Sequence, residues 1–339
     1  MTVTAATASA LRARGLEAVL EPARHAGGEL LQRLGRELAA LDWQLLDRQR
    51  AALQLPGAAA RADDDLQPPE LLPPSLQGDA PGQREARQCG EDVLRAGQVA
   101  VVTVAGGQAS RLGFEGPKGA YPIGPVTGAS LFQILAGQIV RARARYAASL
   151  PWVLMTGPEN DAATRAFFGR RNFFGLGAKS VLFACQGTVP ALTPQGQLLL
   201  AAPDRLFHNP DGHGGIFRAL ARAQILSALE AGGTRLLFTC QVDNPLVRIA
   251  DPVFLGHQRL RSARMTAKAV VKTEPEEKVG ILALKQGLLT CVEYSDLPPA
   301  LQQERAADGG LRFRAGNIAI HGVELDFAAE MAATDLPLH

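Results

Sequence analysis

The sequence predicts an α/β fold: a mostly parallel β-sheet with helices on both faces, preceded by a helical N-terminal region. Three observations predict it. Short, continuously apolar runs are typical of strands that are buried on both faces of a sheet. Amphipathic stretches separate these runs, and such stretches are typical of helices that cover a sheet. A proline-rich segment, residues 63–82, divides this alternating part of the chain from the leucine-rich part before it.

The leucine-rich part is predicted to be helical. Its leucines recur at intervals of three and four residues, as in an amphipathic helix: Leu31, Leu34, Leu38, Leu41 and Leu45. Two heptads are too few for a coiled coil, so we expect this helix to pack on its own domain. The five prolines of residues 63–82 predict an irregular tether, and a short helix is expected over 84–96. We therefore expect a helical N-terminal region over 1–96 and an α/β domain over 97–339.

The alternating part supplies the strands of the sheet. Five apolar runs are predicted to form them: 99–104, 152–156, 181–185, 235–242 and 267–272. Helical patterns between these runs include residues 130–147 and 216–232. Buried strands that alternate with amphipathic helices indicate a mostly parallel sheet that is covered on both faces.

Composition excludes several classes of protein. The 339 residues carry a formal charge of only +2, which gives no broad electrostatic footprint for nucleic acid or an anionic membrane. No stretch reaches the ~18 consecutive apolar residues of a membrane-spanning helix. The four cysteines lie far apart without CxxC spacing, which argues against a disulfide scaffold or a zinc site. We expect a cytoplasmic protein, and the sequence indicates no oligomeric state.

The most informative motif follows the first predicted strand. Gly106 and Gly107 end the apolar run, and Arg111 and Lys118 come within twelve residues of them. A glycine turn after a strand suits phosphate, because its backbone N–H groups are unobstructed. The Walker loop and the dinucleotide fingerprint both require other glycine and lysine spacings than GGQASRLG provides. The two cations therefore predict a site for a polyanion, most simply phosphate.

This stretch resembles the nucleotide-binding signature of the eukaryotic-type UDP-sugar pyrophosphorylases, whose loop reads approximately GGxGTRLG…PK. The match continues in the family's order over roughly residues 20–339, through SLFQILAGQI, VLMTGPEN, FACQGTVPAL, NPDGHGGIFRAL, QVDNPLVRIADPVFLG, EKVGILAL, VEYSDLP and RFRAGNIAIH. The resemblance is closest to the UDP-N-acetylhexosamine branch. It implies a Rossmann-like nucleotidyltransferase fold, with residues 97–339 as the catalytic domain.

The resemblance also implies a reaction. A uridylyltransferase of this family makes UDP-sugar and pyrophosphate from UTP and a sugar-1-phosphate, here best matched by N-acetylglucosamine-1-phosphate. A UTP–glucose-1-phosphate enzyme, a broad-specificity enzyme and a non-catalytic nucleotide-sugar-binding protein remain open. Family members continue beyond DLPLH with a segment that supplies a further phosphate-binding lysine. We therefore expect either a fragment or an impaired activity.

The resemblance assigns the nucleotide half of the site. Gly106 and Gly107 would wrap the triphosphate, with Arg111 and Lys118 as the phosphate-binding cations. The amide of Gln186 would read the uracil edge, which presents a carbonyl beside an N–H group. The backbone of Gly212 would also contact the uracil.

Two residues depart from the family pattern in this loop. Ala109 stands where glycine is usual and Ser110 where threonine is usual. Serine keeps the hydroxyl group. Alanine would cost about 1 kcal/mol if that position required a positive φ.

The remaining assignments concern the metal and the sugar. Asp243 would hold Mg²⁺ against the phosphates, while His213, Gly280, Glu293 and Asn317 are the expected sugar-binding residues. His213 departs from the acetylhexosamine branch, where asparagine is usual, and agrees with glucose-type enzymes, so the acceptor sugar stays open.

Catalysis of this kind needs no general base, because the attacking phosphate oxygen is ionised at neutral pH. We expect positioning and electrostatic stabilisation by Arg111, Lys118 and Mg²⁺ on Asp243.

Overall fold

The computed structural model describes residues 3–54, 66–72 and 82–336. The chain forms two compact units. We call Met1–Gly57, Thr188–Gly212 and Leu336–His339 the helical unit, and Ala58–Gly187 with His213–Asp335 the sheet unit. The predicted tether at 63–82 lies outside the described residues except for 66–72 and Gly82.

The helical unit packs short helices against two small hairpins. Its helical elements are α1 (Ala5–Ala13), η1 (Glu17–Leu20), α2 (Glu21–Ala26), α3 (Gly28–Ala39) and α4 (Trp43–Gln54). Its hairpins pair β5 (Thr188–Pro190) with β8 (His208–Pro210), and β6 (Leu200–Ala202) with β7 (Arg205–Leu206). Leu34 and Leu38 are buried with Leu198 and Leu206, so the predicted leucine face does pack within its own unit.

The prediction of a single helix from Leu31 to Leu45 is wrong in one respect, because this segment forms two helices. Helix α3 ends at Ala39 and α4 begins at Trp43. The Asp42 carboxylate accepts hydrogen bonds from the backbone N–H groups of Gln44 and Leu45, at 3.0 and 2.9 Å. An aspartate in this position starts a new helix, whereas the spacing of the leucines continues across the break.

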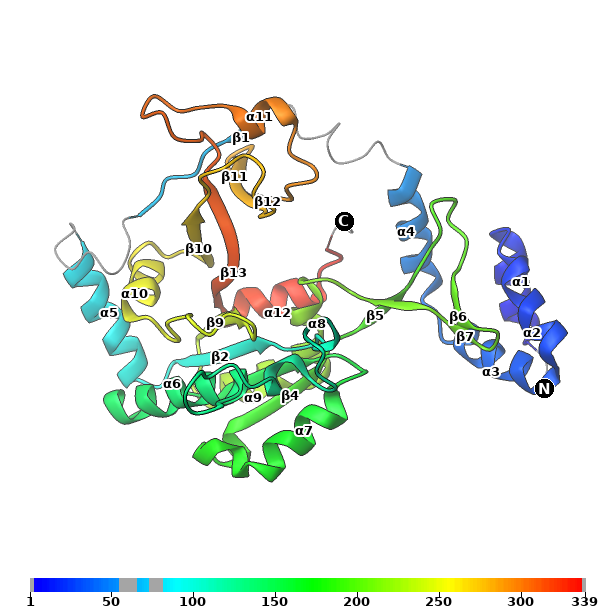
Figure 1. The fold of residues 1–339 in the computed structure, drawn as a ribbon, viewed down its shortest axis with the longest axis horizontal. Coiled ribbons are helices and arrows are strands. Elements are labelled where there is room, and N and C mark those ends of the chain that lie inside the picture. The colour runs from blue at the N-terminus through cyan, green and yellow to red at the C-terminus, as the bar shows by residue number, and fades with distance from the viewer. Residues whose placement is uncertain (1–2, 55–65, 73–81, 337–339) are drawn as a thin grey trace. The chain divides into compact units, whose positions relative to one another are not determined.

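The sheet unit contains a nine-stranded sheet with a parallel core (Figure 1). The core strands are β2 (Val99–Val104), β3 (Trp152–Thr156), β4 (Val181–Cys185) and β9 (Leu236–Gln241), in the order β9-β2-β3-β4. These confirm the predicted strands to within one residue at either end. The parallel pairs follow from the helical crossovers between them, as the alternating pattern predicted.

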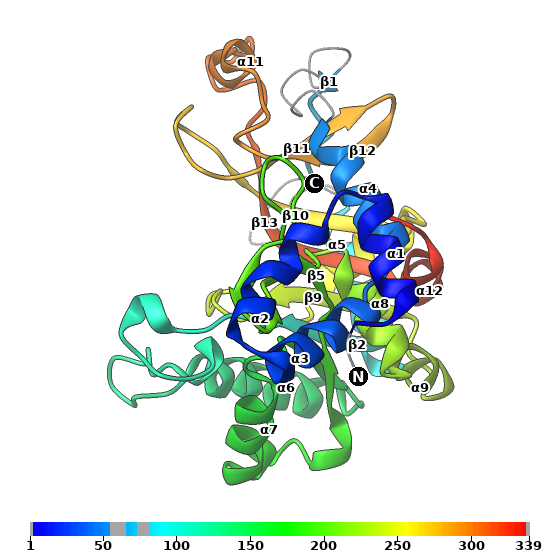
Figure 2. The same ribbon diagram turned by 90° about the vertical axis from the view of Figure 1, so that its right-hand side faces the viewer.

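An antiparallel extension continues the sheet beyond β9. Strand β13 (Ala315–Glu324) pairs with β9, with β10 (Met265–Val271) and with β11 (Ile281–Lys285), which pairs with β1 (Leu66–Gln67) and β12 (Leu288–Val292). The run predicted at 267–272 is therefore a strand, but it lies outside the parallel core. Figures 1 and 2 show β11 and β12 at the end of β13 opposite to α12 (Leu325–Ala333).

Helices cover both faces of the parallel core, as predicted. One face packs on α5 (Gln83–Arg95), α6 (Leu131–Tyr146), α7 (Asp161–Arg170) and α10 (Pro252–Leu260). The other packs on α8 (Gly215–Arg222), α9 (Ile225–Ala231) and α12. Val101 faces the first layer and Val102 the second, which shows why the strands are apolar without interruption.

The helical stretch predicted at 216–232 is also interrupted. Helix α8 ends at Arg222 and α9 begins at Ile225, because Gln224 between them adopts a left-handed backbone with φ +56°. All four cysteines are free thiols. No helix in the described ranges is long and apolar enough to cross a membrane.

Candidate active site

The predicted nucleotide-binding residues follow the carboxyl ends of the parallel strands. Gly106 follows β2, Gln186 follows β4 and Asp243 follows β9. Because parallel strands end at the same edge of a sheet, the topology brings these three positions to one edge. Open α/β sheets bind their ligands at this edge.

Two glycines let the ends of β2 and β3 approach each other closely. A Cβ atom added to Gly157, just after β3, would lie 3.0 Å from the carbonyl oxygen of Gly106. A Cβ atom added to Gly106 would lie 3.3 Å from Oε1 of Gln186. The absence of a side chain at Gly106 therefore places its backbone directly beside the amide predicted to read uracil.

Lys118 lies next to Gly107, the second glycine of the turn. Its backbone N–H donates to the carbonyl of Gly107 at 3.1 Å, and its Cδ atom is 3.8 Å from a Cβ position on that glycine. Its ammonium group forms an ion pair with the carboxylate of Asp243, 125 residues further along the chain. The side chains are 34% and 37% exposed, so both charges stay accessible to a ligand. The structure thus unites Gly107, Lys118 and Asp243.

The glycine turn presents donors to its surroundings. Within the described part of the chain, the N–H groups of Gly106 and Gly107 donate to no protein oxygen. The carbonyl of Gly107 is occupied, because it accepts from the N–H of Lys118 and from the side chain of Asn160. Unused N–H donors beside an ammonium group favour an anion.

The departure at Ala109 causes no strain. Its backbone has φ −96° and ψ 19°, which any residue can adopt, so the expected cost of a positive φ does not arise. Arg111 lies in the short 3₁₀ helix Ser110–Leu112, but its side chain is outside the described part of the structure. Its contact with phosphate stays a prediction.

The residues assigned to uracil lie in different units. The backbone N–H of Gln186 donates to the carbonyl of Thr156 at 2.7 Å, which holds it at the edge of the sheet unit. Gly212 belongs to the helical unit and has φ +78°, a left-handed conformation that favours glycine.

His213 reaches the end of β9. Its Nε2 atom lies 3.1 Å from Nε2 of Gln241, the last residue of that strand and two residues before Asp243. Since an amide nitrogen can only donate, the imidazole accepts this bond. Burial, together with the proximity of His213, lowers the pKa of His321 to about 4.

Two of the predicted sugar-binding residues, Glu293 and Asn317, converge on a third, Gly280. The backbone N–H of Asn317 donates to the carbonyl of Gly280 at 2.7 Å. A Cβ atom on Gly280 would lie 3.4 Å from Oε2 of Glu293 and 3.1 Å from Sγ of Cys291. The amide of Asn317 donates to the same sulfur at 3.3 Å. Cys291 was not predicted as part of this group, because a lone cysteine in a strand carries no signal of its own.

A bulge in β13 orients Asn317. Between Asn317 and Ile320 the pairing with β10 shifts, and Ala319 adopts a left-handed backbone with φ +52°. The N–H of Ala319 donates to the side-chain oxygen of Asn317 at 3.0 Å. Such bulges turn a side chain away from the regular strand pattern.

Strand register places this group at the same edge as the phosphate site. His321 of β13 lies opposite Thr239 of β9, and the two strands are antiparallel. The Asn317 end of β13 therefore extends toward the carboxyl end of β9, where Asp243 lies. Within the sheet unit, Asn317 and Asp243 therefore lie toward the same edge of the sheet.

Asp243 is the carboxylate that is predicted to hold a metal ion. Nowhere in the described residues do three or more histidine, cysteine, aspartate or glutamate side chains form a metal-binding group. Asp243 alone fits a magnesium ion that takes most of its ligands from substrate phosphates and water.

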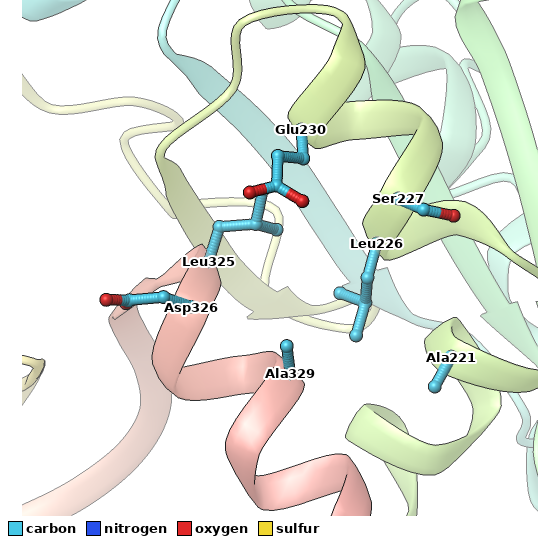
Figure 3. A pocket seen from close by; sticks show the side chains of 7 residues that line it. All are labelled: Ala221, Leu226, Ser227, Glu230, Leu325, Asp326 and Ala329. Carbon is cyan, nitrogen blue, oxygen red and sulfur yellow. The ribbon is translucent and has the colours of Figure 1, made fainter.

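Two hollows in the surface are lined by none of these residues. One is lined by Ala13, Arg14, Asp47 and Arg50 of the helical unit. The other lies between α8, α9 and α12, where Leu226 and Glu230 face Leu325 and Ala329 (Figure 3). Leu325 donates its N–H to the carbonyl of Arg235, just before β9 begins. This hollow is therefore at the opposite edge of the sheet from Asp243.

Comparison with known proteins gives the same family as the sequence motifs. The model of the family described as "UTP--glucose-1-phosphate uridylyltransferase" matches residues 79–336. The chain belongs to this uridylyltransferase family. It is 37% identical over 258 residues to the UDP-N-acetylglucosamine pyrophosphorylase of Saccharomyces cerevisiae, covering 74% of this chain and 54% of that protein. It is 37% identical over 260 residues to the human UDP-N-acetylhexosamine pyrophosphorylase-like protein 1, covering 75% of this chain and 51% of that protein.

Solved structures agree with the family assignment. The UDP-N-acetylglucosamine pyrophosphorylase of Trypanosoma brucei, solved with an inhibitor, is 25% identical with a TM-score of 0.78. That match covers 96% of this chain and 67% of the other. The predicted fold and family are therefore confirmed. The chain spans about half the length of the yeast and human relatives.

Proposed function

We propose that the chain is a uridylyltransferase that makes UDP-N-acetylglucosamine and pyrophosphate from UTP and N-acetylglucosamine-1-phosphate. The observation that carries the proposal is the contact of Lys118 with Gly107 and Asp243 at the carboxyl edge of the sheet. This places a cation, a carboxylate and unused backbone donors at one point, as a nucleoside triphosphate requires. The names of the yeast and human relatives support the acetylated sugar.

The proposed reaction is a displacement at phosphorus. A phosphate oxygen of the sugar-1-phosphate attacks the α-phosphorus of UTP, a new P–O bond forms, and the bond to the β-phosphate breaks to release pyrophosphate. Lys118 and the N–H groups of Gly106 and Gly107 would balance the charge that gathers on the phosphates. The ionised nucleophile needs no base, so positioning supplies the remaining rate enhancement.

The ion pair between Lys118 and Asp243 has a consequence for binding. In the ligand-free chain the two groups neutralise each other, so an arriving phosphate competes with Asp243 for Lys118. Asp243 would then be released to hold Mg²⁺ together with the phosphates. When bound, this ion supplies neutralising charge to the phosphate oxygens.

The sugar would lie against Gly280, Glu293 and Asn317. The carboxylate of Glu293 is exposed and can accept from sugar hydroxyl groups, while the amide of Asn317 can bind an acetamido group. His213 favours glucose-1-phosphate as a second candidate, because histidine is usual there in the glucose-type branch. A cytoplasmic location stays a prediction from the widely spaced cysteines.

The direct test is pyrophosphate release from each of UTP, CTP, ATP and GTP with a panel of sugar-1-phosphates. We expect turnover with UTP and N-acetylglucosamine-1-phosphate. Preference for glucose-1-phosphate would select the second candidate. Equal use of ATP and UTP would contradict the role of Gln186, and nucleotide binding without turnover would indicate a nucleotide-sugar-binding protein.

A further inference from the structure

Asn160 is a buried asparagine whose side chain does not cap the helix that follows it. It lies four residues beyond β3 and directly before α7, and its exposed fraction is 0%. Asparagine in this position usually caps the helix by accepting a hydrogen bond from one of its first N–H groups. Here the side chain forms no such bond. Its amide group instead forms hydrogen bonds to the ends of two strands.

The amide makes three hydrogen bonds, all to the ends of β2 and β3. Its oxygen accepts from the N–H of Gly157 at 2.9 Å. Its nitrogen donates to the carbonyls of Ala105 at 2.8 Å and Gly107 at 3.1 Å. Only this orientation of the amide satisfies all three partners, because one of them is a donor and two are acceptors.

These bonds change what the glycine turn offers to a ligand. Two carbonyl groups on either side of Gly106 are occupied by Asn160, while the N–H groups of Gly106 and Gly107 remain without a protein acceptor among the described residues. A surface that presents donors and hides acceptors attracts an anion. Without the amide, the same turn would present carbonyl oxygens to the phosphates.

The carbonyl of Gly107 also links Asn160 to Lys118. It accepts from the Asn160 amide and from the backbone N–H of Lys118, at 3.1 Å in each case. The position of this carbonyl therefore sets the start of the turn that carries the ammonium group. The buried side chain of Asn160 therefore shares a hydrogen-bonded carbonyl with the backbone of Lys118.

We propose that Asn160 is a positioning residue that holds the glycine turn in its phosphate-binding form. The proposal rests on the proposed function for the nucleotide, but it extends to any polyphosphate at this turn. Asn160 touches no reacting atom and acts through Gly107 and Lys118. It should therefore affect the binding of phosphates and leave the sugar end unchanged.

The test compares Asn160→Asp with the wild-type chain. Aspartate keeps the size of the side chain and the acceptor for Gly157, but it loses both donors. We expect the affinity for UTP and for inorganic tripolyphosphate, each measured calorimetrically with Mg²⁺, to fall about 10- to 100-fold. The KM for UTP should rise while the KM for the sugar-1-phosphate changes less than about twofold. Lowering the pH should restore part of the affinity, because a protonated carboxyl donates again.

Thr164, in the helix that directly follows Asn160, provides a matched control. It is also 0% exposed, but its hydroxyl has no hydrogen-bond partner among the residues that the structure describes. Thr164→Val should leave both affinities within about twofold of wild type. Asn160→Ala, which removes all three bonds, should weaken tripolyphosphate binding at least as much as Asn160→Asp.

The outcomes distinguish the role of Asn160 from the proposed function of the chain. Wild-type affinity for tripolyphosphate in Asn160→Asp would overturn the role of Asn160, as would an equal loss in Thr164→Val. If wild-type protein binds tripolyphosphate but does not prefer UTP to ATP, the proposed function fails while the role of Asn160 is still tested. Should neither Asn160 variant fold, hydrogen exchange of the wild type decides: tripolyphosphate should slow exchange at Gly106 and Gly107, and unchanged exchange there would contradict the proposal.

Discussion

The phosphate end and the sugar end of the candidate site are built on different parts of the sheet. The phosphate end follows β2 and β3, whose residues are almost all buried and whose ends are joined by the buried amide of Asn160. The sugar end lies on the antiparallel extension, where Glu293 and Cys291 are exposed and β12 includes Leu288 at 74% exposure. We therefore expect substitutions at the phosphate end to change both stability and ligand binding. Substitutions at the sugar end should change ligand binding alone.

The largest effect is expected at Asp243. Asp243→Asn removes the carboxylate that pairs with Lys118 and that would hold Mg²⁺, so turnover should fall by ~10²-fold or more. Measured against magnesium concentration, the residual activity should lose its dependence on the ion. Asp308→Asn, at an exposed ion pair with Arg314, is the control and should retain full activity. An unchanged magnesium dependence in Asp243→Asn would remove this residue from the metal site.

Gly157→Ala tests the coupling at the phosphate end. The new Cβ atom would lie 3.0 Å from the carbonyl of Gly106, so the two strand ends must separate. We expect a loss of about 1–3 kcal/mol in the free energy of unfolding together with a roughly tenfold weaker affinity for UTP. Gly169→Ala in α7 is the control, because a Cβ atom there has no neighbour within 4 Å. Unfolding and UTP titrations that show only one of the two losses would contradict the coupling.

The sugar end should behave in the opposite way. Glu293→Gln and Asn317→Ala should each raise the KM for the sugar-1-phosphate by about tenfold, since each removes one polar contact to the sugar. The melting temperature and the affinity for UTP should stay close to those of the wild type. Steady-state kinetics and thermal unfolding together decide this. A lower affinity for UTP in either variant would show that the two ends are not independent.

An effect confined to acidic pH is expected at His321. Burial lowers the pKa of His321 to about 4, below its value of 6.5 in the unfolded chain. Between these values the unfolded state binds a proton that the folded state does not, so stability falls as the pH decreases from 6.5 to 4 and is unaffected above 6.5. The loss is at most about 3 kcal/mol. His321→Gln should flatten the stability curve in this window, and an equal slope in both proteins would refute the role of His321.

The sequence predicted what is local and contiguous. The strands of the parallel core, and the glycine turn with Lys118, follow from apolar runs and from one short motif. Asp42, which divides α3 from α4, shows how one capping residue overrides a leucine pattern that continues past it. The strand β13 was not predicted, because its role depends on pairing with strands far away in the chain.

Roles that depend on tertiary contacts could not be predicted. Asn160 directly before a helix resembles an ordinary capping residue, and only the fold shows that its amide turns back to the glycine turn. Cys291 is likewise placed beside Gly280 and Asn317 by strand pairing alone. The ion pair of Lys118 and Asp243 joins positions that the family resemblance assigned separately.

The central claim is that the glycine turn with Lys118 holds the phosphates of UTP. The most direct measurement is the affinity of Lys118→Ala for UTP and for uridine, titrated side by side with the wild-type chain. The account predicts that Lys118→Ala binds UTP ~30-fold or more weakly while its affinity for uridine is unchanged, because only the phosphates contact the ammonium group. Equal affinity of the two proteins for UTP, or an equal loss for UTP and uridine, would contradict it.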